Sequence, residues 1–231
     1  MLTLTPQPLS VGEIAYRRIR ADIIFGRLAP GQKLKLELLR ERYEASVSTL
    51  RELLSRLASE GLIEAEGQKG FAVTPVSATN LREIAAMRLL LEGHALAQSF
   101  AAGDMEWEGR VVAAHHKLAL MERRMLARDR DDPELWKRYD WEFHHALISA
   151  CGSQVLLETH GAIYDKYLRY QMVAVVFRGD IAAEEHEALL NCALQRDVQG
   201  AVAVLTRHVD GCVEHTLAGG ALAQRMDDWR Q

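Results

Sequence analysis

A carboxylate and an imidazole lie one helical turn apart in the segment 133–150, at Asp140 and His144. Successive residues of an α-helix turn by about 100°, so residues four apart face nearly the same side. The face that carries Asp140 is otherwise apolar and consists of Trp136, Phe143, Leu147 and Cys151. An unpaired carboxylate on an apolar face is costly. Asp140 and His144 are therefore expected to bind a partner inside the protein.

Two further histidines have the same kind of position in the predicted helices 181–198 and 200–217. His186 shares a face with Leu189, Leu190 and Ala193, and His208 shares one with Ala201, Val204, Leu205 and Cys212. Imidazole and carboxylate groups together suit a divalent ion such as Zn, Ni, Mn or Fe. Helices of one bundle can bring such groups to a common point. The sequence therefore predicts a metal site formed by Asp140, His144, His186 and His208.

Three other polar residues are candidates for binding an anionic ligand. Arg88 shares a face of the predicted helix 79–102 with Leu81, Ile84, Leu91 and Ala95. A buried arginine needs an anion; Glu92, one turn on, is one candidate partner, and the carboxylate of a bound ligand is the other. Tyr164 and Arg169 are candidates for lining the same pocket, with ordinary helix packing as the alternative. The remaining histidines are interpreted as packing or surface residues: His94, His115, His116, His145, His160 and His215.

The N-terminal part of the sequence has a different organisation, in which short helices precede a hairpin. The expected elements are helices over Ser10–Phe25, Leu36–Tyr43 and Ser48–Gly61, then strands over Ile63–Ala65 and Phe71–Val73. Ser10 and Glu13 have the spacing of a capping box. Helix, turn, second helix and a glycine-containing hairpin form the outline of a winged helix-turn-helix, a module that binds DNA. Residues 74–77 are the expected linker.

The candidate DNA contacts lie at the start of the second helix of this motif and at the tip of the hairpin. Arg51 is in the first turn of the recognition helix, where side chains reach base edges or phosphates. Ser46, Ser48 and Thr49 are short donors for phosphate contacts, with helix capping as the alternative. Lys69 and Gly70 form the tip of the predicted wing.

The rest of the chain has a helical pattern throughout. Six helices are expected over 79–102, 105–128, 133–150, 153–178, 181–198 and 200–217. Short breaks between long helices favour antiparallel packing in one bundle. The predicted fold is therefore mainly α, with a winged helix-turn-helix over residues 1–76 and an antiparallel helical bundle over 77–231.

Composition is consistent with a cytoplasmic globular protein. Of 231 residues, 48% are hydrophobic and 26% charged, and no stretch resembles a membrane span. The three cysteines lie inside predicted helices and are interpreted as reduced core residues. Residues 1–76 carry 11 Lys and Arg against 9 Asp and Glu, whereas the remainder carries 17 against 23. A slightly basic N-terminal part on an acidic body is compatible with a DNA-binding head.

Two motifs resemble known families. The run Ser46 to Glu52 resembles the start of the recognition helix in the GntR superfamily, although Thr49 stands where proline is usual and Val47 where arginine is common. The pattern Asp140-x-x-x-His144, Glu185-His186 and Arg207-His208 is similar to the metal-binding FCD domain of the FadR branch, in its six-helix VanR-type form. The resemblance implies a bacterial transcription regulator that acts as a homodimer; it is expected to be a repressor, with activation as the alternative that the sequence leaves open. It also implies a double-stranded DNA operator and a small organic-acid effector bound at the metal.

Two other interpretations stay open at this point. A metal held by three histidines and one aspartate can also support hydrolysis, but no second carboxylate accompanies the ligands on their apolar faces to serve as general base. Alternatively, the histidines of a regulator bind the effector directly, without a metal. The sequence favours a non-enzymatic regulator with a metal site over both.

Overall fold

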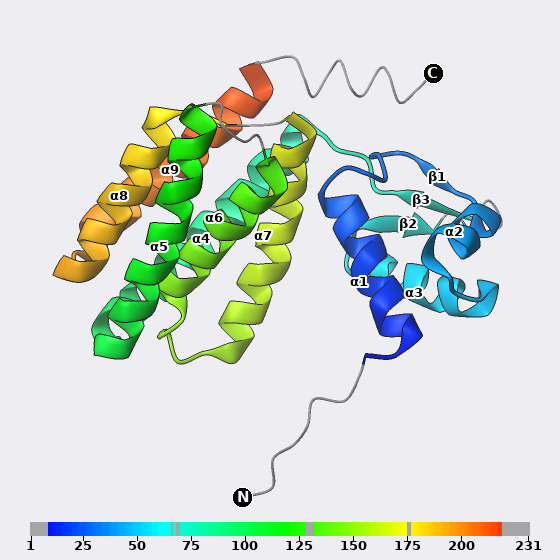
Figure 1. Cartoon of the computed structure of the whole chain (residues 1–231), viewed down its shortest axis with the longest axis horizontal. Coiled ribbons are helices and arrows are strands. Elements are labelled where there is room, and N and C mark those ends of the chain that lie inside the picture. The colour runs from blue at the N-terminus through cyan, green and yellow to red at the C-terminus, as the bar shows by residue number, and fades with distance from the viewer. Residues whose placement is uncertain (1–8, 66, 68–69, 128–131, 175–176, 219–231) are drawn as a thin grey trace, which may run out of the picture. The chain divides into compact units, whose positions relative to one another are not determined.

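The computed structural model describes residues 9–65, 67, 70–127, 132–174 and 177–218. These residues form two compact units, one within residues 1–76 and one within residues 77–225. The fold is mainly α, as predicted (Figure 1). None of the described helices combines the length and the apolar character that a membrane span requires.

The first unit consists of three helices and a small antiparallel sheet. Its elements are α1 (Val11–Ile24), β1 (Lys33–Leu34), α2 (Leu36–Tyr43), α3 (Val47–Ser59), β2 (Ile63–Ala65) and β3 (Phe71–Val73). Strands β2 and β3 pair as the predicted wing, with Ile63 opposite Val73. Strand β1 was not predicted; at two residues it is too short to produce an alternating pattern, and it extends the sheet in the order β1-β3-β2.

Helix α3 begins at Val47, one residue before the predicted start, because Ser46 caps it. The Ser46 hydroxyl oxygen accepts a hydrogen bond from the Thr49 amide at 3.1 Å, and Glu44 adopts a left-handed conformation (φ 54°) that turns the chain between α2 and α3. The buried face of α3 anchors it to the unit's core and comprises Leu50, Leu53, Leu54 and Leu57. The opposite face of α3 is left to solvent.

Helix α1 has half of its predicted capping box. The Ser10 hydroxyl accepts a hydrogen bond from the Glu13 amide at 3.1 Å, as expected. The Glu13 carboxylate, however, accepts from Arg17 at 2.9 Å instead of turning back to the cap. An opposite charge one turn away competes successfully for the carboxylate.

The second unit is a bundle of long helices. They are α4 (Ala78–Ala102), α5 (Met105–Leu126), α6 (Pro133–Ile148), α7 (Gln154–Ala174), α8 (Asp180–Gln195) and α9 (Val198–Ala218). Helix α4 packs against α7 and α9, and α5 packs against α6 and α8 (Figure 1). Helices α6, α8 and α9, which carry the predicted metal ligands, therefore meet inside one bundle.

The boundary between α8 and α9 differs from the prediction, in which one helix ended at 198 and the next began at Gly200. The chain turns at Arg196, which has a positive φ of 58°, and Gly200 lies inside the first turn of α9. The Gly200 amide donates to the Asp197 carboxylate at 2.9 Å, and a Cβ at Gly200 would lie 2.2 Å from that carboxylate. The glycine allows a close capping contact and does not end a helix.

Candidate metal centre and DNA-binding face

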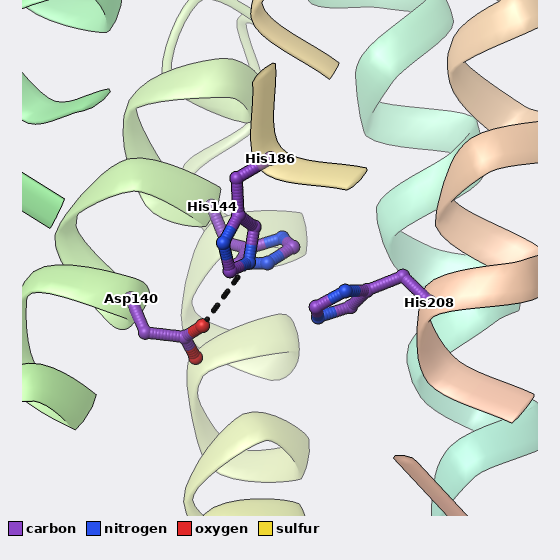
Figure 2. Close-up of side chains that lie close together, drawn as sticks. All are labelled: Asp140, His144, His186 and His208. Carbon is purple, nitrogen blue, oxygen red and sulfur yellow. Dashed lines mark ion pairs between the residues drawn. The ribbon is translucent and has the colours of Figure 1, made fainter. Parts of the chain in front are cut away.

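The four predicted metal ligands come together in the helical unit. Asp140 and His144 project from α6, His186 from α8 and His208 from α9 (Figure 2). Each offers one ligand atom, and these four atoms all lie within 4.8 Å of one another. All four side chains are buried. The helical phases read from the sequence thus correctly identified residues that converge.

Atoms facing the centre of this cluster lack hydrogen-bond partners. Asp140 Oδ1, His144 Nε2 and His186 Nε2 are buried without a hydrogen bond among the described residues. Asp140 Oδ1 and His186 Nε2 lie 3.3 Å apart without a hydrogen bond, and the contact is an ion pair only when the imidazole is protonated. Because buried polar atoms are almost always satisfied, three unsatisfied atoms around one point fit a bound cation.

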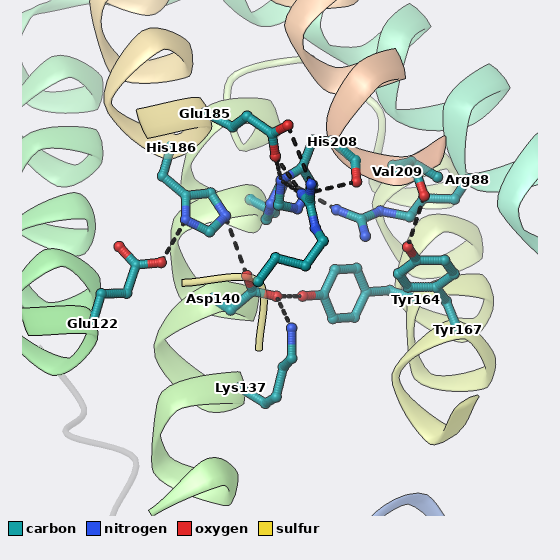
Figure 3. A network of polar contacts seen from close by, with 12 residues as sticks. Arg88, Glu122, Lys137, Asp140, Tyr164, Tyr167, Glu185, His186, His208 and Val209 are labelled. Atoms are coloured by element: carbon teal, nitrogen blue, oxygen red, sulfur yellow. Dashed lines mark hydrogen bonds and ion pairs between the residues drawn. The ribbon is translucent and has the colours of Figure 1, made fainter. Parts of the chain in front are cut away.

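Each of the three histidines uses its other ring nitrogen to contact a glutamate. His144 Nδ1 lies 2.5 Å from Glu92, and His186 Nδ1 lies 2.7 Å from Glu122. His208 Nδ1 lies 2.8 Å from Glu185 (Figure 3). An Nδ1–H that donates to a carboxylate leaves the Nε2 lone pair for a metal, which is the usual arrangement around histidine ligands. All three rings are therefore oriented and polarised for metal binding through Nε2.

The two carboxylates beside His186 favour a positive charge on or next to its imidazole ring. Burial by itself lowers the pKa of His186, but Asp140 and Glu122 outweigh burial and raise that pKa to about 9. The two carboxylates that stabilise a proton on this imidazole also stabilise a metal ion beside it. At His208 burial prevails and lowers the pKa to about 3, despite the hydrogen bond with Glu185. His208 is therefore neutral near pH 7, as a metal ligand must be.

Arg178, which precedes α8, secures the His208 side of the cluster. Its guanidinium donates to the Glu185 carboxylate and, at 3.2 Å, to the His208 carbonyl oxygen. Burial would raise the pKa of Glu185, but His208 and Arg178 together lower it to about 2. A Cβ at Gly211 would lie 2.7 Å from Arg178 Nη1, so the glycine leaves room for this contact.

Arg88 is fully buried beside His144. Its partner is Glu92, one of the two alternatives that the sequence suggested. Its Nε donates to Glu92 at 2.9 Å, while Nη2 lies 3.1 Å from His144 Nδ1. Burial would raise the pKa of Glu92, but Arg88 and His144 hold it well below its usual range. His160, interpreted from sequence as a packing residue, also contacts Glu92, at 3.0 Å. Arg88 Nη1 is buried without a hydrogen bond among the described residues.

Of the two candidate pocket residues on α7, Tyr164 reaches the cluster. Its hydroxyl donates to Asp140 Oδ2, and Lys137 Nζ lies 3.6 Å from the same oxygen (Figure 3). Arg169 is buried on the same helix. Five residues of an α-helix turn by about 500°, so Arg169 projects about 140° away from Tyr164. A role for Arg169 at the effector stays a prediction.

Glu122, Glu185 and Arg178 had no role assigned from the sequence, although all three support the histidine ligands. Glu122 lies one turn after Leu118 on the apolar face of α5, so the helical-phase argument applied to Asp140 would have found it. Glu185 is adjacent to His186 in sequence, but its contact with His208 depends on how α8 meets α9. These carboxylates are engaged by histidines or arginines, and none has the freedom expected of a general base.

In the first unit, three predicted DNA-contacting residues at the start of α3 form hydrogen bonds among themselves through the Ser46 hydroxyl group. Ser46 Oγ lies 2.8 Å from Ser48 Oγ and 2.9 Å from Thr49 Oγ1. The Thr49 methyl group also lies beside Gly12 of α1. These contacts support the capping alternative for Ser46 and Thr49, while the exposed Ser48 keeps acceptor capacity for another contact.

Arg51 projects from the solvent-facing side of α3 and makes no ion pair with any described residue. It lines a groove of about 590 Å³ together with Lys35, Ser55 and two residues of the wing, Gly70 and Phe71. Gly70 has a positive φ of 96°, which glycine adopts readily. Lys69 lies outside the described residues, so its predicted contact is not placed.

Comparison with known proteins assigns a family to each unit. Residues 12–73 match the bacterial regulatory proteins of the gntR family, and residues 83–211 match the FCD domain. Among curated proteins, the HTH-type transcriptional regulator BphR of Paraburkholderia xenovorans is 39% identical over 209 residues, which is 88% of this chain and 84% of BphR. The HTH-type transcriptional repressor GlaR of Escherichia coli is 32% identical over 84% of this chain and 90% of its own. These relatives are regulators and not enzymes, as the sequence predicted.

Solved structures share the fold. Escherichia coli McbR/YncC superimposes with a TM-score of 0.77 at 20% identity, over 92% of this chain and 99% of its own. A GntR-type transcriptional regulator of Rhodococcus sp. RHA1 gives 0.74 at 20% identity, over 91% and 99%. The two family matches and the relatives that span most of the chain lead to the same family assignment. The chain therefore belongs to the GntR family of bacterial regulatory proteins, as a DNA-binding transcription regulator whose C-terminal unit is an FCD domain.

Proposed function

We propose that the protein is an effector-responsive repressor in which a small organic acid binds at a divalent metal inside the helical unit. The observation that carries this proposal is the set of three His–Glu pairs around a buried aspartate, with unsatisfied ligand atoms facing one point. Zn, Ni, Mn or Fe suits this donor set. The description of GlaR as a repressor supports the same direction of regulation here.

The metal would be held by Asp140, His144, His186 and His208. Four protein ligands close a tetrahedral ion, so an ion that also receives an effector must accept five or six ligands. Such an ion supplies a Lewis-acidic centre for a carboxylate group. Arg88 is placed beside His144 with Nη1 unsatisfied, and a guanidinium binds carboxylates well. Arg88 is therefore the proposed anchor for the effector, with Tyr164 holding Asp140 in place.

A thermal-shift screen of organic acids tests the effector proposal. Ligands that bind only the folded state raise the unfolding temperature, and the rise grows with the ratio of ligand concentration to Kd. At least one acid is expected to stabilise metal-loaded protein and to have no such effect after chelation and dialysis. Equal stabilisation with and without metal would favour direct binding by the histidines instead. A screen for hydrolysis by metal-loaded protein addresses the enzymatic alternative, which the regulator relatives do not favour.

The proposed operator-binding species is a homodimer acting in the cytoplasm. One winged module reads few base pairs, so two copies on a palindromic operator provide specificity economically. Sedimentation velocity at micromolar concentration is expected to show a dimer both alone and with operator DNA. A stable monomer under both conditions would contradict the dimer.

Arg51 is expected to contribute directly to operator binding. Replacing it with alanine removes an exposed guanidinium from the groove between α3 and the wing, and it should weaken specific binding by about 1–3 kcal/mol. Fluorescence anisotropy with an operator duplex measures the change. Arg110→Ala, on the exposed side of α5, is the matched control. Unchanged operator affinity in folded Arg51→Ala protein would exclude Arg51 from the interface.

A further inference from the structure

Val47, the first residue of the recognition helix α3, is apolar and only partly buried. The apolar face of α3 is buried without it and comprises Leu50, Leu53, Leu54 and Leu57. Among the described residues, the partly buried apolar side chains that pack against the core of this unit are Leu36, Ala58 and Phe71, and Val47 is not one of them. Core packing therefore does not account for a valine at this position.

Val47 lies in line with the residues that face the groove. Residues four apart on a helix differ by about 40° in direction, so Val47, Arg51 and Ser55 form one row along α3. Arg51 and Ser55 line the groove between α3 and the wing. Val47 is the member of the row closest to the N-terminal end of α3, which is the end that meets base edges in helix-turn-helix proteins.

The chemistry of valine limits what it can recognise there. Its side chain has no donor or acceptor, so it makes no hydrogen bond to a base edge or a phosphate. In the major groove the apolar group among the base edges is the C5-methyl group of thymine. We propose that Val47 is a specificity-determining residue that contacts the methyl group of one thymine in each operator half-site. This inference rests on the proposed operator binding.

The row along α3 then combines two kinds of recognition. Arg51 supplies a charged donor for guanine or phosphate, and Val47 one turn earlier supplies an apolar surface for a neighbouring A·T pair. A polar base edge placed against Val47 would lose water without gaining a hydrogen bond, which is unfavourable. Val47 therefore selects thymine both by contact and by excluding other bases.

Thymine-to-uracil scanning tests the assignment, because uracil lacks only the C5-methyl group and pairs in the same way. An operator is first selected from a pool of randomised duplexes with the full-length protein. Each thymine is then replaced by uracil in turn. At one thymine per half-site, uracil is expected to weaken wild-type binding about fourfold, the value for one methyl group returned to water. Val47→Ala is expected to bind the thymine operator more weakly and to bind thymine and uracil equally at that position.

The comparison between base and residue separates recognition from a structural role. Alanine favours helix more than valine does, so the variant is expected to fold. Val112→Ala, on the exposed side of α5, is the matched control and should keep full sensitivity to uracil. The assignment is wrong if no thymine responds to uracil, or if Val47→Ala responds as the wild type does. If selection enriches no sequence, operator binding itself fails, and the assignment fails with it.

Discussion

Replacing His186 and His208 with alanine is expected to abolish stoichiometric metal binding and the response to effector. Each imidazole supplies one of four converging ligand atoms, and each is oriented by its own glutamate. Removing both leaves one carboxylate and one imidazole, too few to hold a divalent ion against dialysis. Elemental analysis of dialysed protein measures the loss. Operator affinity without effector should remain within about twofold of wild type, since both histidines belong to the helical unit and neither lies in the DNA-binding unit.

Controls distinguish a lost ligand set from a damaged fold. His94→Ala/His116→Ala removes two exposed histidines from the same unit and should retain metal. His208→Gln keeps a polar side chain of similar size in the bundle and should still lose much of the metal affinity. Retention of one equivalent of metal by folded His186→Ala/His208→Ala protein would refute the ligand assignment.

Glu92→Ala is expected to be the most destabilising single change in the helical unit. The Glu92 carboxylate compensates the fully buried charge of Arg88 and accepts hydrogen bonds from His144 and His160. Breaking a buried ion pair from one side typically costs about 3–5 kcal/mol, because an uncompensated charge stays behind. Urea unfolding at pH 7 measures the loss. The pKa of Glu92 is lowered in the folded state, so its stabilising effect is present above the unfolded pKa and fades as pH falls below that value.

The matched control is Glu83→Ala, an exposed glutamate of the same helix, which should cost little. Arg88→Met/Glu92→Leu removes both charges and should recover part of the stability, because apolar residues of similar volume often replace a buried pair without loss. A loss in Glu92→Ala no larger than in Glu83→Ala would show that the pair does not stabilise the fold.

Helical periodicity was enough to identify the converging ligands but not their supporting residues. Asp140, His186 and His208 each interrupt an apolar face, and an interruption of that kind is visible in one helix at a time. Arg178, by contrast, precedes α8 and reaches Glu185 and His208 through tertiary packing. No spacing within a single helix encodes such a contact. Strand β1 escaped prediction for a similar reason, since it exists only through its pairing with β3.

Local chemistry explains the errors in element boundaries. Glycine commonly ends helices, which is why a helix boundary was expected at position 200. In the structure Gly200 lies inside α9, where its lack of a Cβ lets the Asp197 carboxylate accept a hydrogen bond from its amide. The turn at Arg196 requires a positive φ, which arginine rarely adopts, so the residue type does not indicate a helix end at this position. At the start of α3 the sequence was sufficient, because Ser46 is both a preferred capping residue and the first polar group before an apolar repeat.

The most direct test of metal-dependent regulation is operator affinity measured across a panel of organic acids with matched metal-loaded and metal-stripped protein. Coupling between two sites typically changes affinity by about 5–150-fold. One acid is expected to weaken operator binding within that range for metal-loaded protein and to leave metal-stripped protein unaffected. His186→Ala/His208→Ala should behave as stripped protein does even when metal is supplied. An equal response in loaded and stripped protein would contradict a metal-bound effector as the source of regulation.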